Sequence, residues 1–151
     1  MEIEVLTFSS KKEVIEKVAK FYIKELNLTK SKYKVVIITD PKLRKDGANG
    51  LCAKTSDREI TVALYSRLNM LDMLLTLAHE MVHVKQFARG QYKGVPMKYG
   101  KGAYHFWMGQ KVNAEYLQRP WEIEAYSKQE ILVQKLYKYI DKRSAKKKKK
   151  A

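Results

Sequence analysis

Two histidines and a glutamate stand at a spacing that suits a metal ion, because His79, Glu80 and His83 form the pattern His-Glu-x-x-His. Residues four positions apart lie on the same face of a helix, so both imidazoles can bind one ion. Zinc accepts neutral nitrogen ligands in tetrahedral geometry, and a catalytic zinc site needs one more protein ligand and an open position for water. Glu80 can take the proton from that water, so the pattern predicts zinc-dependent hydrolysis with Glu80 as general base.

The third ligand has three candidates in the sequence, namely His105, Glu122 and Glu124. The two glutamates are two positions apart, so on a helix they point about 200° away from each other. The helical stripe that contains Glu122 continues through Ala125 and Leu132 and is the inward face. We therefore predict Glu122 as the third ligand and expect Glu124 on the surface, with His105 as the alternative.

The elements that must position these residues follow from periodicity and from capping and turn residues. The pattern predicts a helix at 11–27, a strand at 33–39, a hairpin from 51–54 and 59–65, a buried helix between Asn69 and Gly90, and a last helix at 120–143. Residues 90–119 are expected to form an elaborated loop with a short strand near 103–112. The fold class is therefore α+β, with an N-terminal helix, a small three-stranded and mostly antiparallel sheet, a central His-Glu-x-x-His helix, and a C-terminal helix that supplies the third ligand.

The charge of the chain is strongly positive, with 31 Lys and Arg against 16 Asp and Glu in 151 residues, a formal net charge of +15. Seven of these positive charges fall in residues 142–150, which leaves 15 − 7 = +8 for residues 1–141. We predict one domain over 1–143 and a disordered Lys-rich tail over 144–151. Such a tail attracts polyanions, so nucleic acid is one predicted partner class.

Other compositional features bear on the location of the protein. No run of 18 apolar residues is present, so we expect no membrane span and no membrane partner. Cys52 is the single cysteine, which suits a reducing cytoplasm.

A basic, glycine-rich and aromatic stretch follows the His-Glu-x-x-His pattern. No acidic residue occurs between Glu80 and Glu115, whereas six lysines or arginines and five of the seven glycines fall there. The stretch has three interpretations: a lid that recognises an acidic peptide, a surface that stacks bases and binds phosphates, or a surface loop packed on the core by its aromatic residues.

Three segments of the sequence resemble small zinc metallopeptidases encoded by tailed phages: LAHEMVHVKQ at 77–86, HFWMG at 105–109 and PWEIEAY at 120–126. The predicted order of elements is similar to SprT-like and minimal gluzincin metallopeptidase domains. The resemblance implies a zincin-like fold over roughly residues 10–140, Zn²⁺ as cofactor, a peptide or protein substrate, and a host cytoplasm as location. In gluzincins with a Glu-x-x-Ala motif the first glutamate is the ligand, which corresponds to Glu122.

The same resemblance leaves two alternatives open. SprT-like proteins use a third histidine, and that position would fall to His105. The resemblance to SprT-like proteins also implies an alternative function, in which the chain acts on or at DNA-bound proteins and its metal site is auxiliary or degenerate. In that case nucleic acid would bind the basic tail and the basic loop. Where the related families often have Asp or Asn after the alanine, this chain has Tyr126.

Overall fold

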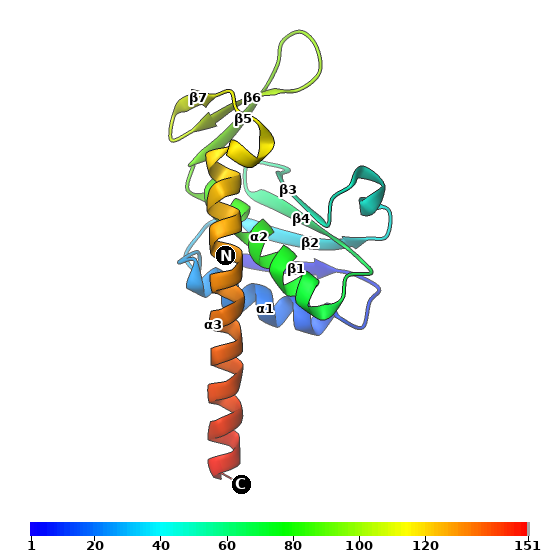
Figure 1. Ribbon diagram of the computed structural model, residues 1–151, viewed down its shortest axis with the longest axis vertical. Helices are drawn as coiled ribbons and strands as arrows, with labels where there is room; N and C mark the ends of the chain where they lie inside the picture. Colours follow the sequence, from blue (N-terminus) through cyan, green and yellow to red (C-terminus); the bar gives the residue numbers. More distant parts are fainter. Residues whose placement is uncertain (151) are drawn as a thin grey trace.

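The structure is a computed structural model that describes residues 1–150, with all of their side chains except those of residues 45 and 46. The described chain is α+β, with three α-helices and two separate sheets (Figure 1). The helices are α1 (Lys12–Glu25), α2 (Met70–Ala88) and α3 (Pro120–Lys150). The first sheet contains β1 (Glu2–Leu6), β2 (Lys34–Asp40), β3 (Gly50–Lys54) and β4 (Glu59–Tyr65), and the second contains β5 (Tyr92–Pro96), β6 (Ala103–Trp107) and β7 (Gln110–Val112). Short 3₁₀ turns occur at Leu43–Asp46 and Tyr116–Gln118.

The first sheet has the strand order β1-β2-β4-β3, in which β2 is parallel to both of its neighbours and only β3 is antiparallel. The prediction of a three-stranded, mostly antiparallel sheet is therefore wrong. The missed strand β1 is five residues long and alternates Glu2 and Glu4 with Ile3 and Val5, a pattern too short to stand out. Since α1 lies between β1 and β2 in the chain, it supplies the crossover connection that two parallel neighbouring strands require.

The core lies on one face of this sheet, where the buried strand residues alternate. Val35 and Ile37 of β2 are paired with Ile60 and Val62 of β4, and all four are fully buried. The core cluster also includes buried residues of α1, α2 and α3, so this face is the one that the helices cover. The Tyr22 hydroxyl donates a hydrogen bond to a backbone carbonyl of α2 and joins two of these helices.

Helix α2 is the central helix of the domain, as the sequence predicted. Asn69 caps its first turn by accepting a hydrogen bond from the backbone N–H of Asp72. The chain turns out of its C-terminal end at Gly90, which has a φ of 65° that favours glycine. Met81, Val82 and Val84 have no exposed surface, so the helix is held rigidly in the core.

Residues 92–112 form the second sheet, where the sequence predicted a loop with one short strand. It lies at one end of the molecule, away from the first sheet (Figure 1). The rings of Tyr92, His105 and Trp107 pack on Trp121 of α3, with centroid distances of 4.9, 5.3 and 6.4 Å. The aromatic residues therefore hold this sheet against the start of α3.

Helix α3 continues to Lys150 and extends well beyond the body of the protein (Figure 1). The sequence predicted disorder from residue 144, whereas the structure is helical through 144–150. Leu136 is the last buried residue of this helix, and beyond it the ring of Tyr139 still packs on Phe21 of α1 at a centroid distance of 5.1 Å. Lysine and alanine are good helix formers, which accounts for the continuation. In the part of the chain that the structure describes, no helix is both long and apolar enough to cross a membrane.

Candidate metal centre

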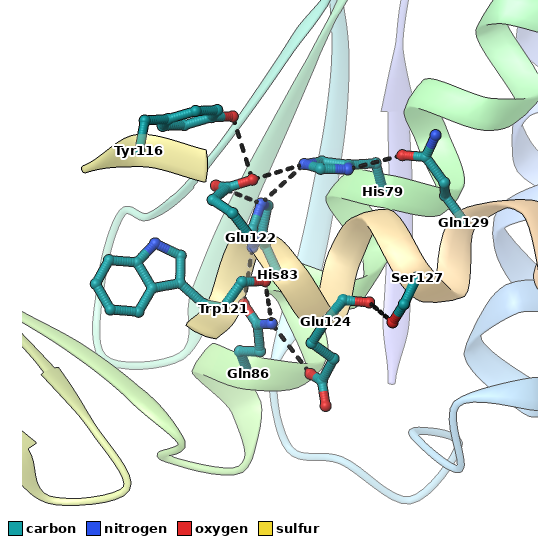
Figure 2. A network of polar contacts seen from close by, with 9 residues as sticks. All are labelled: His79, His83, Gln86, Tyr116, Trp121, Glu122, Glu124, Ser127 and Gln129. Atoms are coloured by element: carbon teal, nitrogen blue, oxygen red, sulfur yellow. Dashed lines mark hydrogen bonds and ion pairs between the residues drawn. The ribbon is translucent and has the colours of Figure 1, made fainter. Parts of the chain in front are cut away.

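The side chains of His79, His83 and Glu122 meet between α2 and α3 (Figure 2). The two Nε2 atoms are 3.2 Å apart, and each lies 3.1 Å from a different oxygen of the Glu122 carboxylate. The side chains are only 7 to 12% exposed. The central helix and the first turn of α3 thus bring together three side chains that together could bind a metal ion.

The separations among these ligand atoms fit a tetrahedral ion. An ion with bonds of about 2.0–2.1 Å holds neighbouring ligand atoms about 3.3 Å apart. The separation of 3.2 Å between the two Nε2 atoms and that of 3.1 Å between His79 Nε2 and Glu122 Oε2 are close to that value, while His83 Nε2 lies 3.1 Å from the other oxygen, Oε1. Two imidazole nitrogens and one carboxylate are also a donor set that zinc accepts, with one position left open.

The other nitrogen of each imidazole is held by a glutamine. His79 Nδ1 lies 2.9 Å from Gln129 Oε1, and His83 Nδ1 lies 2.7 Å from Gln86 Oε1. An amide oxygen only accepts, so each Nδ1 must carry the proton and donate it. In neutral rings both Nε2 atoms are then bare lone pairs that face each other and a carboxylate. Such a group of acceptors is stable only around a positive charge, which a metal ion or a proton supplies.

The orientation of Gln86 is fixed by a buried polar network (Figure 2). Its Nε2 donates to the Trp121 carbonyl at 2.9 Å and to Glu124 Oε1 at 3.0 Å, so its oxygen must face His83. Lys85, whose side chain is 4% exposed, donates to the same Glu124 oxygen at 2.6 Å. Burial lowers the pKa of Lys85, and the neighbouring Glu124 carboxylate partly restores it. The expectation that Glu124 is a solvated surface residue is wrong, because it is the acceptor that orients Gln86.

The pKa values of the triad reflect this mutual contact. Burial raises the pKa of Glu122, but hydrogen bonds from His79 and His83, and their charges, outweigh burial and lower the pKa to about 2. Burial lowers the pKa of His83, but the hydrogen bond that its ring donates to Glu122 and the charges of Glu80 and Glu122 raise the pKa above 6.5 overall. The carboxylate is therefore ionised at neutral pH and available as a ligand.

Glu80 lies beside the triad and has no hydrogen bond to any residue that the structure describes. It is 6% exposed, and burial raises its pKa to about 6, against the charges of His83 and His79. Its carboxylate packs against Gly50, where a Cβ atom would lie 2.9 Å from Glu80 Oε1 and 2.7 Å from the methyl group of Thr76. The absence of a side chain at position 50 thus makes room for the carboxylate.

Two tyrosines complete the wall of the site. The Tyr116 hydroxyl donates to Glu122 Oε2 at 3.1 Å, and its pKa is raised, first by burial and then by the Glu122 charge. The Tyr126 ring packs on the edge of the His79 ring at a centroid distance of 4.5 Å. The hydrogen-bond partner of His79 Nδ1 is Gln129, one helical turn after Tyr126.

Two cavities adjoin the triad, one of about 560 Å³ and one of about 200 Å³. Both are lined by Gly50, Leu51, His79, Glu80 and Tyr116, so together they form one cleft that runs past Glu80. Among the side chains that the structure describes, no lysine or arginine lines either cavity. The exposed lysines of the stretch 81–114 lie elsewhere, on the second sheet and its connections, namely Lys93, Lys98, Lys101 and Lys111.

The alternative ligand His105 does not belong to the triad. It lies on β6, where its Nδ1 is 2.7 Å from the Tyr92 hydroxyl. The glutamines that hold the histidines were missed in the sequence, although their spacing gave a signal. Gln86 follows His83 by three positions, and Gln129 follows Glu122 by seven, so each lies on the same helical face as its neighbour in the site.

Comparison of the chain with models of known protein families, with curated proteins and with solved structures finds no match.

Proposed function

We propose that this protein is a zinc-dependent peptidase, with His79, His83 and Glu122 as ligands and Glu80 as general base. The observation that supports this most directly is that two imidazole Nε2 atoms, 3.2 Å apart, each lie 3.1 Å from one oxygen of the same carboxylate, while both Nδ1 atoms are hydrogen-bonded to glutamines. A site that only stabilised the fold would be closed by a fourth protein ligand. Here the triad opens onto a cleft, and an unpaired carboxylate lies beside it.

In this proposal Glu80 moves the proton that the reaction must transfer. Zinc at the triad would act as a Lewis acid that polarises water and the substrate carbonyl. Glu80 takes a proton from the attacking water while the oxygen of that water bonds to the carbonyl carbon of the substrate. The carboxyl group then gives that proton to the amide nitrogen as the C–N bond breaks, which releases an acid and an amine. The Tyr116 hydroxyl lines both cavities and can stabilise the oxyanion if its hydrogen bond turns from Glu122 to the substrate oxygen.

Strand β3 offers an edge along which a peptide can align. The Asn49 carbonyl accepts from Tyr65 N–H and Thr55 N–H donates to the Glu59 carbonyl, so odd-numbered residues bond to β4. The backbone groups of Gly50, Cys52 and Lys54 therefore point to the outer edge. Gly50 and Cys52 also line the smaller cavity, so a peptide added to this edge would pass the triad.

The proposal includes the zincin-like fold and the resemblance to gluzincin and SprT-like domains. What supports it is the arrangement of a mixed sheet with one antiparallel edge strand, a central helix bearing the two histidines, and a later helix bearing the acidic ligand. The position of His105 outside the triad favours the gluzincin type of ligand set.

The test uses Glu80→Gln, which keeps the shape of the side chain and removes its ability to take a proton. Zinc is measured by elemental analysis and cleavage by mass spectrometry of an unfolded protein substrate. We expect one zinc per chain in both proteins, with cleavage lost at least a hundredfold in the variant. Glu130→Gln, the same change at an exposed position of α3, should cleave like the wild type. Undiminished cleavage by Glu80→Gln, or a wild-type chain without zinc, would refute the proposal.

A further inference from the structure

The larger cavity extends from Glu80 along α2 and is walled by side chains of several elements. Its floor is formed by one face of α2, on which Asp72, Thr76 and Glu80 follow one another at intervals of four residues. A helix rises 1.5 Å per residue, so the Asp72 backbone lies about 12 Å from that of Glu80. Asp72 is thus at the far end of the cavity from the proposed reaction centre.

The side walls of the cavity suit an amphipathic side chain. Leu75 and the ring of Tyr126 provide apolar surface, while Asn49 and Gln129 provide amide groups. Lysine and arginine have an apolar stem and a charged head, so a stem can pack on Leu75 and Tyr126 while the head reaches Asp72. The face of an aromatic ring also attracts a cation.

The charge of the cavity is opposite to that of the protein. Although the chain has a net charge of +15, the acidic and basic residues that line this cavity are His79 and the two carboxylates Asp72 and Glu80, among the side chains that the structure describes. Neither of them has an ion pair with a lysine or arginine whose side chain the structure describes. Glu80 is moreover more than nine-tenths buried, forms no hydrogen bond with any side chain that the structure describes, and lines the cavity. Physiological salt screens charges beyond about 8 Å, so the distant lysines weigh little against a carboxylate in the wall.

We propose that this cavity is a specificity pocket for a lysine or arginine side chain of the substrate, with Asp72 as the specificity-determining residue. The inference rests on the proposed peptidase function and names its substrate class. This basic substrate side chain has the opposite charge to the acidic peptide that the basic stretch 81–114 suggested. The difference arises because the lysines of that stretch do not line the cleft.

The distances allow such a side chain to reach Asp72. A peptide on the edge of β3 advances about 3.3 Å per residue. A lysine side chain extends on the order of 6 Å from the backbone. A residue two positions from the scissile carbonyl reaches about 13 Å and therefore covers the distance of about 12 Å between the reaction centre and Asp72.

Asp72 also lies in the first turn of α2, where a negative charge stabilises a helix. Loss of the charge should therefore lower stability slightly whether or not the residue contacts substrate. Only a role in specificity changes the ratio of rates between two substrates, so the ratio is the quantity to measure.

The experiment compares the zinc-loaded full chain with Asp72→Asn and Asp72→Lys on fluorogenic peptides that differ at one residue, which is Lys, Met or Glu. For the wild type we expect kcat/KM for the Lys peptide to exceed that for the Met peptide about tenfold. The ratio should fall to near one in Asp72→Asn, and Asp72→Lys should prefer the Glu peptide. Asp57→Asn makes the same change in the exposed turn between β3 and β4 and should keep the wild-type ratios.

Wild-type ratios that persist in both Asp72 variants would overturn the inference. If the wild type cleaves none of the peptides, the proposed function fails, and the pocket is then tested by binding alone. Fluorescence anisotropy with zinc-loaded Glu80→Gln should show tighter binding of the Lys peptide than of the Met peptide, and Asp72→Asn in that background should abolish the difference. Equal binding of the two peptides to Glu80→Gln would also overturn the inference.

Discussion

Gln86 is the residue at which the metal site and the fold depend most directly on one another. Gln86→Met keeps the length of the side chain but removes the acceptor 2.7 Å from His83 Nδ1 and both N–H donors. Loss of such an outer partner typically weakens metal binding 10- to 100-fold, or about 1.4–2.7 kcal/mol. The Trp121 carbonyl also loses its side-chain donor, a hydrogen bond that contributes about 0.5–1.5 kcal/mol to the free energy of unfolding. Glu124 keeps its contact with Lys85.

Two measurements separate these effects. Zinc affinity is obtained by competition with a chromophoric chelator, and stability by thermal unfolding of the metal-free protein. For a chain of this size, each kcal/mol should lower Tm by about 2–4 °C. Gln129→Met is the matched variant, because Gln129 contacts His79 Nδ1 but has no second hydrogen bond within the described chain. It should weaken zinc binding about tenfold and leave Tm nearly unchanged.

The reasoning would be refuted if Gln86→Met, folded and stable, bound zinc as tightly as the wild type. It would be equally refuted if both variants lost the same amount of metal-free stability, because the buried network then would not distinguish Gln86 from Gln129. Gln134→Met, at an exposed position of α3, should change neither quantity.

The remaining predictions concern the geometry, the ligand set and pH. Gly50→Ala should lower kcat at least tenfold with zinc content unchanged, because the new Cβ would lie 2.9 Å from Glu80 Oε1 and must displace the carboxylate. An unaltered kcat would show that the contact between position 50 and Glu80 does not affect catalysis. Glu122→Ala should abolish zinc binding, and His105→Ala should leave it intact, as elemental analysis can verify. In the metal-free chain, the lowered pKa of Glu122 stabilises the fold above pH 4.5, and the raised pKa of His83 stabilises it below pH 6.5. The raised pKa of Glu80 means that the fold favours its protonated form, so stability is lost as the pH rises from 4.5 through about 6. The Tm of the metal-free chain should therefore be highest near pH 5 and fall toward pH 8. A Tm that rises toward pH 8 would contradict this.

The sequence was sufficient to find the residues of the metal centre that belong to helices. His79 and His83 are four positions apart on a strongly apolar helix, and the stripe through Ala125 and Leu132 selected Glu122 over Glu124. These predictions depend only on helical periodicity, which is a local property of the chain. That is why the structure brings those side chains together as expected.

The features that the sequence could not predict depend on contacts between distant segments. The roles of Gln86 and Glu124 arise only when α2 and α3 pack, since 38 positions separate the two residues (124 − 86). The second sheet pairs short strands that are rich in glycine and aromatic residues, and such strands give weak alternation. The parallel arrangement of β2 depends on β1, whose five residues resemble a polar terminus.

The separation of the ligands along the chain gives the metal a further role. His83 and Glu122 are 39 positions apart (122 − 83), and the entire second sheet lies between them. An ion that bridges them is a cross-link that closes this loop, much as a disulfide would. The chain-entropy model assigns to a closed loop of this length a stabilisation of about 4 kcal/mol. Chelation should therefore accelerate amide hydrogen exchange in residues 92–112 more than in the first sheet, whose strands lie outside the loop.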